Sequence, residues 1–259
     1  MLGISDIIIL SLVEGITEFL PISSTGHLII ANYFLGLTSS HFLTTFEIFI
    51  QLGAIMAVVY LYGPKLMVSK NLSLKVLTAF VPTAVIGFLL YPLIKNVLLA
   101  SDSLVVWALL LGGVVIIAFE WWYSPKTGQA LSPVENITWK QAFLVGLGQA
   151  VAVIPGVSRS GATIITGLAV GLPRQAIVEF SFLLAIPTML GATGYDLFKT
   201  NVLTFSALQY QSLILGFIGS FLVSLVVVRW FLQYIQHHNF TIFGLYRVVL
   251  ALVLWLVIF

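Results

Sequence analysis

The chain has 259 residues, of which 60% are hydrophobic and only 8% are charged. Soluble domains carry about a quarter charged residues, so this composition excludes a water-facing globule and predicts a membrane protein. The net charge of +2 without a basic run argues against a nucleic-acid partner. The absence of cysteine excludes disulfides, thiolate metal sites and a cysteine nucleophile.

The first apolar stretch covers residues 4–37 and is interrupted at residues 21–27, which read PISSTGH. Its N-terminal part lacks a basic region and carries acidic residues, so we expect it to be retained rather than removed as a signal peptide. Glu14 and Glu18 are four residues apart and therefore share one face of a helix. Carboxylates inside an apolar segment predict a function, here oxygen ligands for a divalent cation. The alternative is a solvated pair near the outer interface.

The interruption itself offers Ser23, Ser24, Thr25 and His27. A hydroxyl near a His or Glu is the usual arrangement of an activated nucleophile, and His27 could instead act as a general acid. Alternatively, the hydroxyls only cap the following half-helix and His27 is structural. Capping and chemistry are compatible, because a capped helix N-terminus is itself an anion site.

Three apolar runs follow, at about 43–63, 74–92 and 103–122, each long enough to cross a bilayer. Turn or charge signals bound them, including Gly-Pro-Lys at 63–65, which predicts a loop over 64–73. The aromatic residues at 121–123 suit a membrane interface.

A second interrupted stretch covers residues 140–172, with its break at 155–161, PGVSRSG. Arg159 is the informative residue, because a guanidinium at membrane depth is expensive and its planar fork matches phosphate oxygens. The alternative is a fold clamp in which Arg159 pairs with Glu14 or Glu18. The break predicts an anion site made from the following residues: Gly156, Ser158, Arg159, Ser160 and Thr163.

Three further runs lie at about 177–197, 210–234 and 242–258. Interrupted segments in corresponding positions of two halves predict repeats with a binding site near the bilayer midplane. We therefore expect an all-α polytopic membrane protein with about six transmembrane helices and two re-entrant helical hairpins. The two inverted-topology repeats are residues 1–125 and 139–259. Glu47 and Glu179 occupy similar positions in the halves and are expected to be structural partners or to face the cavity.

Lys and Arg residues set the expected orientation. With re-entrant hairpins, most of them gather on one side, which the positive-inside rule makes cytoplasmic. Both termini then face outward, the first hairpin enters from outside, and the site opens toward the outer side. Arg174, Arg229 and Arg247 are interpreted as topology anchors. The cations of the cytoplasmic group are Lys65, Lys70, Lys75, Lys126, Lys140, Arg174, Arg229 and Arg247, against Lys95 and Lys199 opposite.

Carboxylates, hydroxyls and a His facing an Arg and backbone donors are the parts that phosphoryl transfer needs. A lipid phosphate explains their membrane depth, whereas a soluble ester does not. A transporter that flips a lipid phosphate between leaflets is the alternative, since inverted repeats are also transporter architecture. It needs no nucleophile or paired carboxylates, which favours an enzyme. A structural scaffold leaves the intramembrane charges unexplained.

The chain resembles the undecaprenyl-pyrophosphate phosphatase family of the bacitracin-resistance type. The resemblance covers nearly the whole chain and is carried by EGITEFLPISSTGH at 14–27, FEIFIQLG at 46–53, PGVSRSGAT at 155–163 and EFSFLLAIP at 179–187. It implies a bacterial inner-membrane hydrolase that converts undecaprenyl pyrophosphate to undecaprenyl phosphate and inorganic phosphate. That reaction recycles the carrier lipid of peptidoglycan synthesis and confers bacitracin resistance.

The resemblance also implies roles for individual residues. Glu18, Ser24, His27 and Arg159 match catalytic positions, with a Mg²⁺ or Ca²⁺ ion held by Glu14 and Glu18. A homodimer and an active site open to the periplasm are further expectations. The residues expected to contact the pyrophosphate are Ser23, Thr25, Gly156, Ser158, Arg159, Ser160 and Thr163.

Overall fold

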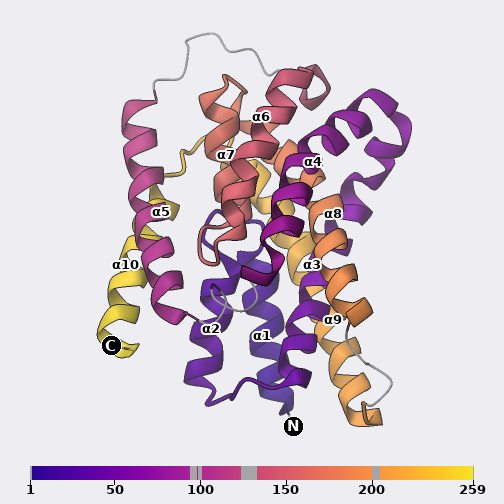
Figure 1. Ribbon diagram of the computed structural model, residues 1–259, viewed down its shortest axis with the longest axis vertical. Coiled ribbons are helices and arrows are strands. Elements are labelled where there is room, and N and C mark those ends of the chain that lie inside the picture. The colour runs from indigo at the N-terminus through magenta and orange to yellow at the C-terminus, as the bar shows by residue number, and fades with distance from the viewer. Residues whose placement is uncertain (1, 94–97, 99–100, 124–132, 200–204, 259) are drawn as a thin grey trace.

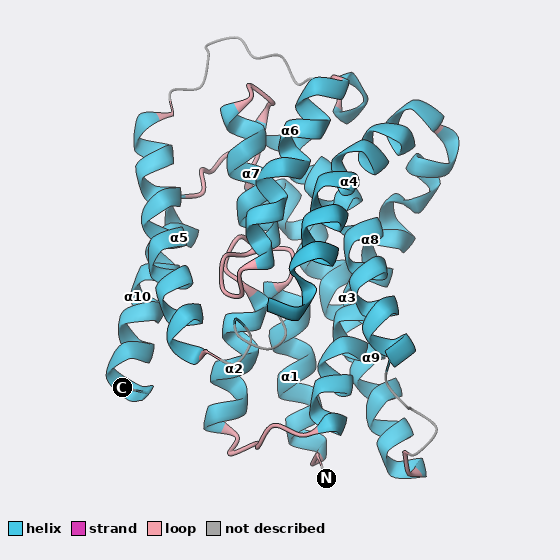
Figure 2. Ribbon diagram, in the orientation of Figure 1, coloured by secondary structure: helices cyan, strands magenta, loops and turns pink. Residues whose placement is uncertain are grey.

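The computed structural model describes residues 2–93, 98, 101–123, 133–199 and 205–258, and all regular secondary structure in these ranges is helical (Figures 1 and 2). Lys95 and Lys126, which contributed to the expected orientation, lie outside the described residues. The helices in chain order are α1 (Ile4–Thr17), α2 (Ser24–Phe34), α3 (His41–Val68), α4 (Lys70–Leu93), α5 (Asp102–Trp122), η2 (Val134–Asn136), α6 (Trp139–Ala150), η3 (Val151–Val153), α7 (Arg159–Ala169), α8 (Arg174–Lys199), α9 (Ala207–Tyr234) and α10 (Thr241–Ile258).

Five helices of the described chain are long and apolar enough to cross a membrane: α3, α4, α5, α8 and α9. The helix α10 is equally apolar but shorter over its described residues. Many large apolar side chains on these helices are exposed, such as Phe88, Leu111 and Val226, as expected where lipid replaces water. The prediction of an all-α, multi-pass membrane protein is confirmed.

Two pairs of helices are shorter than the others, and each pair forms a helical hairpin. The hairpin of α1 and α2 and the hairpin of α6 and α7 approach each other from opposite ends of the molecule, and their connecting loops meet near its middle (Figure 1). Each helix in these pairs has 11 to 14 residues, too few to cross about 30 Å of hydrocarbon. The chain is interrupted between Thr17 and Ser24 and between Val153 and Arg159. These interruptions coincide with the Pro-, Gly- and hydroxyl-rich segments, as predicted.

The two tips share an unusual backbone conformation. Ser23 has φ 70° and Ser158 has φ 74°, and these are the residues other than glycine with positive φ in the described chain. Each serine is the N-cap of the helix that follows, and its hydroxyl accepts a hydrogen bond from the amide of Gly26 or Gly161, respectively. A left-handed serine is strained by roughly 1–3 kcal/mol, and such strain persists where the surroundings over-determine it.

Small residues let the hairpins pack tightly on the long helices. On α1, a Cβ at Gly15 would lie 2.7 Å from Val223 of α9, and Ser224 donates a hydrogen bond to the Gly15 carbonyl. On α6, a Cβ at Gly146 would lie 2.0 Å from the Ala79 carbonyl of α4. The first hairpin thus packs on α9 and the second on α4.

The expected loop over 64–73 is wrong. The helix α3 continues through Pro64 to Val68, and α4 begins at Lys70, which leaves only Ser69 between them. Proline removes one backbone donor but does not always end a helix within a protein. The Ser73 hydroxyl donates to the Leu66 carbonyl at 2.6 Å and stabilises the sharp corner.

Candidate active site

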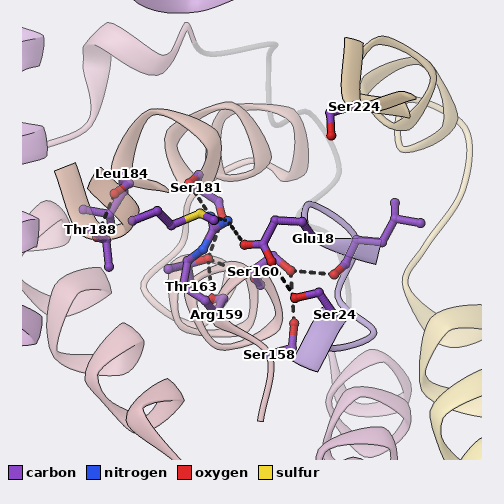
Figure 3. A network of polar contacts seen from close by, with 12 residues as sticks. Glu18, Ser24, Ser158, Arg159, Ser160, Thr163, Ser181, Leu184, Thr188 and Ser224 are labelled. Carbon is purple, nitrogen blue, oxygen red and sulfur yellow. Dashed lines mark hydrogen bonds and ion pairs between the residues drawn. The ribbon is translucent and has the colours of Figure 1, made fainter. Parts of the chain in front are cut away.

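Glu18 lies at the centre of the site and joins the two hairpin tips. It follows the last residue of α1, and its amide donates to the Glu14 carbonyl, so it continues the helical geometry. One carboxylate oxygen accepts the Ser24 hydroxyl at 2.5 Å, and the other accepts Arg159 Nη2 at 3.0 Å (Figure 3). The side chains of Glu18 and Arg159 are only 7% and 12% exposed. A hydroxyl, a carboxylate and a guanidinium are therefore linked inside the molecule.

Arg159, the first residue of α7, is held by the first hairpin and by α8. Besides Glu18, its guanidinium donates to the Ser181 carbonyl at 3.0 Å and contacts the Met189 sulfur, and it lies over the Phe19 ring. Its Nε is buried without a hydrogen-bond acceptor among the described residues. A buried donor without a partner is costly, so this N–H is suited to a ligand oxygen. The alternative interpretation, in which Arg159 pairs with Glu14 or Glu18, is met by the ion pair with Glu18, and a role in phosphate binding stays a prediction.

Hydroxyls tie the second tip to its surroundings. The Ser160 hydroxyl donates to the Leu20 carbonyl of the first tip at 2.7 Å, and it lies 3.1 Å from the Ser158 hydroxyl. Thr163, fully buried, pairs with the Ser181 hydroxyl at 2.6 Å. Of these predicted binding residues, Ser160 and Thr163 are therefore engaged within the protein and support the tip.

The tips bring together the first turns of α2 and α7. Thr25 lies half-buried in the first turn of α2, and Gly156 turns the second tip with φ +92°. A Cβ at Gly161 would lie 3.7 Å from the Pro21 Cβ, so the start of α7 lies against the loop that precedes α2. Glu18 contacts the first residue of each helix, Ser24 and Arg159. Helix N-termini carry unpaired N–H groups and a positive partial charge. Two of them meeting beside Arg159 make a favourable site for an anion.

His27 lies next to the hydrogen-bonded series of Ser24, Glu18 and Arg159 but is not a member of it. Its Nδ1 lies 2.7 Å from the Ser23 carbonyl, and its Nε2 lies 2.7 Å from the Tyr246 hydroxyl of α10. Since a carbonyl only accepts, Nδ1 carries a proton, and Nε2 of the neutral ring accepts from the tyrosine. The proton partner of Ser24 in this structure is therefore Glu18, and not His27.

Glu14 is the most isolated polar group of the site. It is 1% exposed, and neither carboxylate oxygen has a hydrogen-bond donor among the described residues. Glu47 instead accepts from Asn32 at 2.7 Å, which fits the structural role considered for it. Within the described chain, no group of three or more His, Asp or Glu side chains gathers as for a metal. The two unpartnered oxygens, beside Glu18, do suit a hard cation that takes its other ligands from a phosphate.

Sequence reasoning missed two residues of α10. Arg247 is fully buried and donates to carbonyls of both tips, so its interpretation as a topology anchor is wrong. Tyr246, which contacts His27, was not considered. The signal for Arg247 was available, since a charged residue six positions inside an apolar run is a functional hypothesis by default. Arg174, in contrast, makes an ion pair with Glu120 and lies over the rings of Tyr123 and Phe240.

Comparison with known proteins identifies the family of the chain. The family model of bacitracin resistance protein BacA matches residues 7–253. The chain is 50% identical to an undecaprenyl-diphosphatase of Aquifex aeolicus over 95% of both chains. It is 47% identical to one of Wolinella succinogenes, over 95% of this chain and 94% of the relative. It is 46% identical to one of Thermus thermophilus, over 96% of this chain and 95% of the relative. With a matching model over most of its length and relatives this similar, the chain belongs to the BacA bacitracin resistance family.

Proposed function

We propose that this protein is a membrane phosphatase that hydrolyses undecaprenyl pyrophosphate to undecaprenyl phosphate and inorganic phosphate. The observation that carries the proposal is the buried chain from the Ser24 hydroxyl through Glu18 to Arg159. Ser24 can act as the nucleophile, Glu18 as its base and Arg159 as the cation that binds the phosphate. These three groups are what phosphoryl transfer from a bound phosphate to a hydroxyl requires. The names of the relatives supply the lipid substrate. Recycling of the peptidoglycan carrier lipid and bacitracin resistance follow from that reaction.

In the proposed mechanism, the Ser24 oxygen attacks the terminal phosphorus while its proton passes to Glu18. The bond from that phosphorus to the bridging oxygen breaks, and undecaprenyl phosphate leaves. Water then cleaves the phosphoserine to release inorganic phosphate. Arg159 and the N–H groups at the starts of α2 and α7 stabilise the negative charge on the transferred group. Direct attack by water is the other route, and trapping of ³²P on Ser24 distinguishes them.

His27 has a supporting role in this mechanism. Its ring is oriented between Ser23 and Tyr246, both at hydrogen-bond distance. We place it beside the leaving phosphate, where Nε2, once it has taken up a proton from solvent, can donate that proton after the Tyr246 contact rearranges. Thr25, Ser158 and Gly156 shape the backbone that faces the pyrophosphate.

A divalent cation, Mg²⁺ or Ca²⁺, would be held by Glu14 and Glu18. The unpartnered, buried oxygens of Glu14 support this assignment. When bound, the cation would neutralise charge on the pyrophosphate. Retention of activity after exhaustive chelation would contradict this part of the proposal.

We also propose the inverted-repeat architecture, with six spans and both termini outside in the bacterial inner membrane. Three observations support it. The serine caps of the two tips share a positive φ, and both termini lie in the lower part of Figure 1. The helix α1 packs on α9 and α6 packs on α4, so the first helix of each half contacts the fourth helix of the other half. The site would then open to the periplasm. A homodimer stays a prediction, which cross-linking in native membranes would test.

The decisive experiment measures phosphate release from undecaprenyl pyrophosphate by the purified protein in detergent, with Mg²⁺ or Ca²⁺ and with EDTA. We expect cation-dependent release that Arg159→Ala abolishes. A well-folded wild type that releases no phosphate would refute the enzyme. That result would favour the transporter. A transporter requires no hydroxyl bonded to a carboxylate, so the contact between Ser24 and Glu18 supports the enzyme.

A further inference from the structure

Arg247 of α10 is the largest fully buried side chain in the described structure. We infer that Arg247 is a positioning residue that holds the two hairpin tips in register for the pyrophosphate and keeps a positive charge behind them. The inference rests on the proposed function, because it concerns the geometry of that same site. It follows from the partners of the guanidinium, from the glycines that make room for it and from its charge.

All five N–H groups of the guanidinium have backbone acceptors. Nη1 donates to the carbonyls of Pro21 and Val157 at 3.3 and 2.9 Å, and Nη2 to those of Gly156 and Ala108, each at 2.9 Å. Nε donates to the Leu109 carbonyl at 3.3 Å. A guanidinium has five donors in a fixed fork, so Arg247 is saturated and has none left for a substrate. Arg247 therefore acts on the reaction without touching the substrate, through the backbone that it holds and through its charge.

The carbonyls that it binds lie at the most demanding point of each tip. Pro21 is two residues before the strained cap Ser23, and Val157 directly precedes the strained cap Ser158. Since Ser24 and Arg159 directly follow these caps, a shift of either tip would move the nucleophile relative to the guanidinium that faces it. Arg247 is thus connected to both sides of the catalytic chain, by one hydrogen bond to the first tip and two to the second.

Glycines on two helices make room for this side chain. A Cβ at Gly112 of α5 would lie 2.2 Å from Arg247 Nη2. A Cβ at Gly113 would lie 2.7 Å from the Gly244 carbonyl of α10, so the helices cross in close contact. The tight crossing brings α10 near enough for Arg247 to reach past α5 to the tips. The buried position is therefore built by several residues and is not an accident of one rotamer.

The charge of Arg247 is left without a carboxylate partner within the described residues, where its contacts are carbonyls only. A buried cation without an anion is costly, and a pyrophosphate bound between the tips would compensate for it. Arg159, in contrast, already shares its charge with Glu18 at 3.0 Å. Arg247 can therefore contribute to anion affinity through space even though it touches no substrate.

The test uses the absence of cysteine from the chain. The Cβ positions of Pro21 and Gly161 are 3.7 Å apart, close to the roughly 3.8 Å mean of disulfides. The double substitution Pro21→Cys with Gly161→Cys therefore reports the contact between the tips by its rate of oxidation. The reporter is combined with Arg247→Lys, Arg247→Met and, as a matched control, Arg229→Met at an exposed arginine of α9.

We expect oxidation in the Arg229→Met background to match that of the parent reporter. In the Arg247→Lys and Arg247→Met backgrounds we expect it to slow by about tenfold, the size of the loss of one charge-assisted hydrogen bond. Without the reporter cysteines, Arg247→Lys should keep part of the substrate affinity that Arg247→Met loses, since lysine keeps the charge. Gly112→Ala should raise KM as well, because it displaces the guanidinium and leaves every charge in place.

Unchanged oxidation rates and an unchanged KM in folded Arg247→Lys would overturn the inference. If Arg247→Met does not fold, Arg247→Lys and Gly112→Ala still decide it, because a merely structural role predicts lower thermal stability with KM and tip oxidation unaffected. Failure of the proposed function is distinguishable, since it is seen as a lack of phosphate release by the wild type. The oxidation assay requires no turnover.

Discussion

The exchange Glu18→Gln removes one charge from the centre of the site and leaves its shape in place. Glu18 accepts two hydrogen bonds, from Ser24 at 2.5 Å and from Arg159 at 3.0 Å. A glutamine has only one side-chain oxygen, and the guanidinium, which can only donate, would take it. The amide NH₂ would then face Ser24, so the serine would become an acceptor and lose its base.

The size of the effect follows from these two contacts. Loss of a positioned general base costs about 10²- to 10⁴-fold in kcat. The contact with Arg159 changes from an ion pair to a hydrogen bond between a cation and a neutral amide, which lowers stability by about 1–2 kcal/mol. Glu18→Ala would instead leave a buried guanidinium unpaired, at about 3–5 kcal/mol, so it is the less informative variant.

The assay is phosphate release from undecaprenyl pyrophosphate under saturating substrate, with thermal unfolding of the same preparation. Glu179→Gln is the matched control, because Glu179 is a carboxylate paired with Lys65 at 2.6 Å, and the structure gives it no hydrogen bond or ion pair to the tips within the described residues. We expect kcat to fall only in Glu18→Gln and KM to change by a few-fold at most. A Glu18→Gln enzyme with kcat near that of the wild type would refute the assignment of Glu18 as the base.

Three further predictions concern other residues of the site. Ser24→Ala should abolish ³²P labelling of the protein and lower kcat by at least about 10²-fold, since no nucleophile remains. Tyr246→Phe should leave folding intact, because Tyr246 is 43% exposed, and should lower kcat several-fold with little change in KM, because His27 loses the hydroxyl at Nε2. Gly156→Ala should lower thermal stability by roughly 1–3 kcal/mol or more, because φ is +92° and the new Cβ would lie 2.7 Å from the Val105 carbonyl.

Each of these predictions has an outcome that contradicts it. Full turnover by Ser24→Ala would leave only direct attack by water. A Tyr246→Phe enzyme with a pH profile and kcat like those of the wild type would mean that the contact with His27 is incidental. A Gly156→Ala protein as stable as the wild type would show that the tip can adopt another backbone conformation.

The residues whose burial in a membrane costs the most free energy could be predicted from the sequence. Glu18 and Arg159 are charged groups in apolar segments, and Ser24 lies in a break that no membrane helix tolerates without a reason. The breaks themselves were predictable because proline, glycine and hydroxyl residues act locally on the backbone. All of these signals lie within a few residues of the feature that they predict.

The contacts that depend on distant segments were not predictable. Arg247 binds carbonyls from three parts of the chain, and the contact nearest in sequence is 90 residues away. No residue near position 247 indicates which carbonyls these are. His27 could be recognised as a site residue, but its partner Tyr246 is 219 positions away. The helix α3 passes through Pro64 because tertiary packing outweighs the local preference of proline for a helix end.

The two tips are similar in backbone and opposite in chemistry, and this explains why the site needs both. Each places the residue after a strained serine cap at the centre of the molecule: Ser24 from the first tip and Arg159 from the second. Nine residues before each cap lies a fully buried polar residue, which is Glu14 in the first hairpin and Gln149 in the second. Two copies of the first tip would hold acids and hydroxyls but no cation for the phosphate. Two copies of the second would bind an anion without a nucleophile or base. In the proposed mechanism, hydrolysis requires both hairpins together, and the contact from Ser160 to the Leu20 carbonyl is one of the hydrogen bonds that join them.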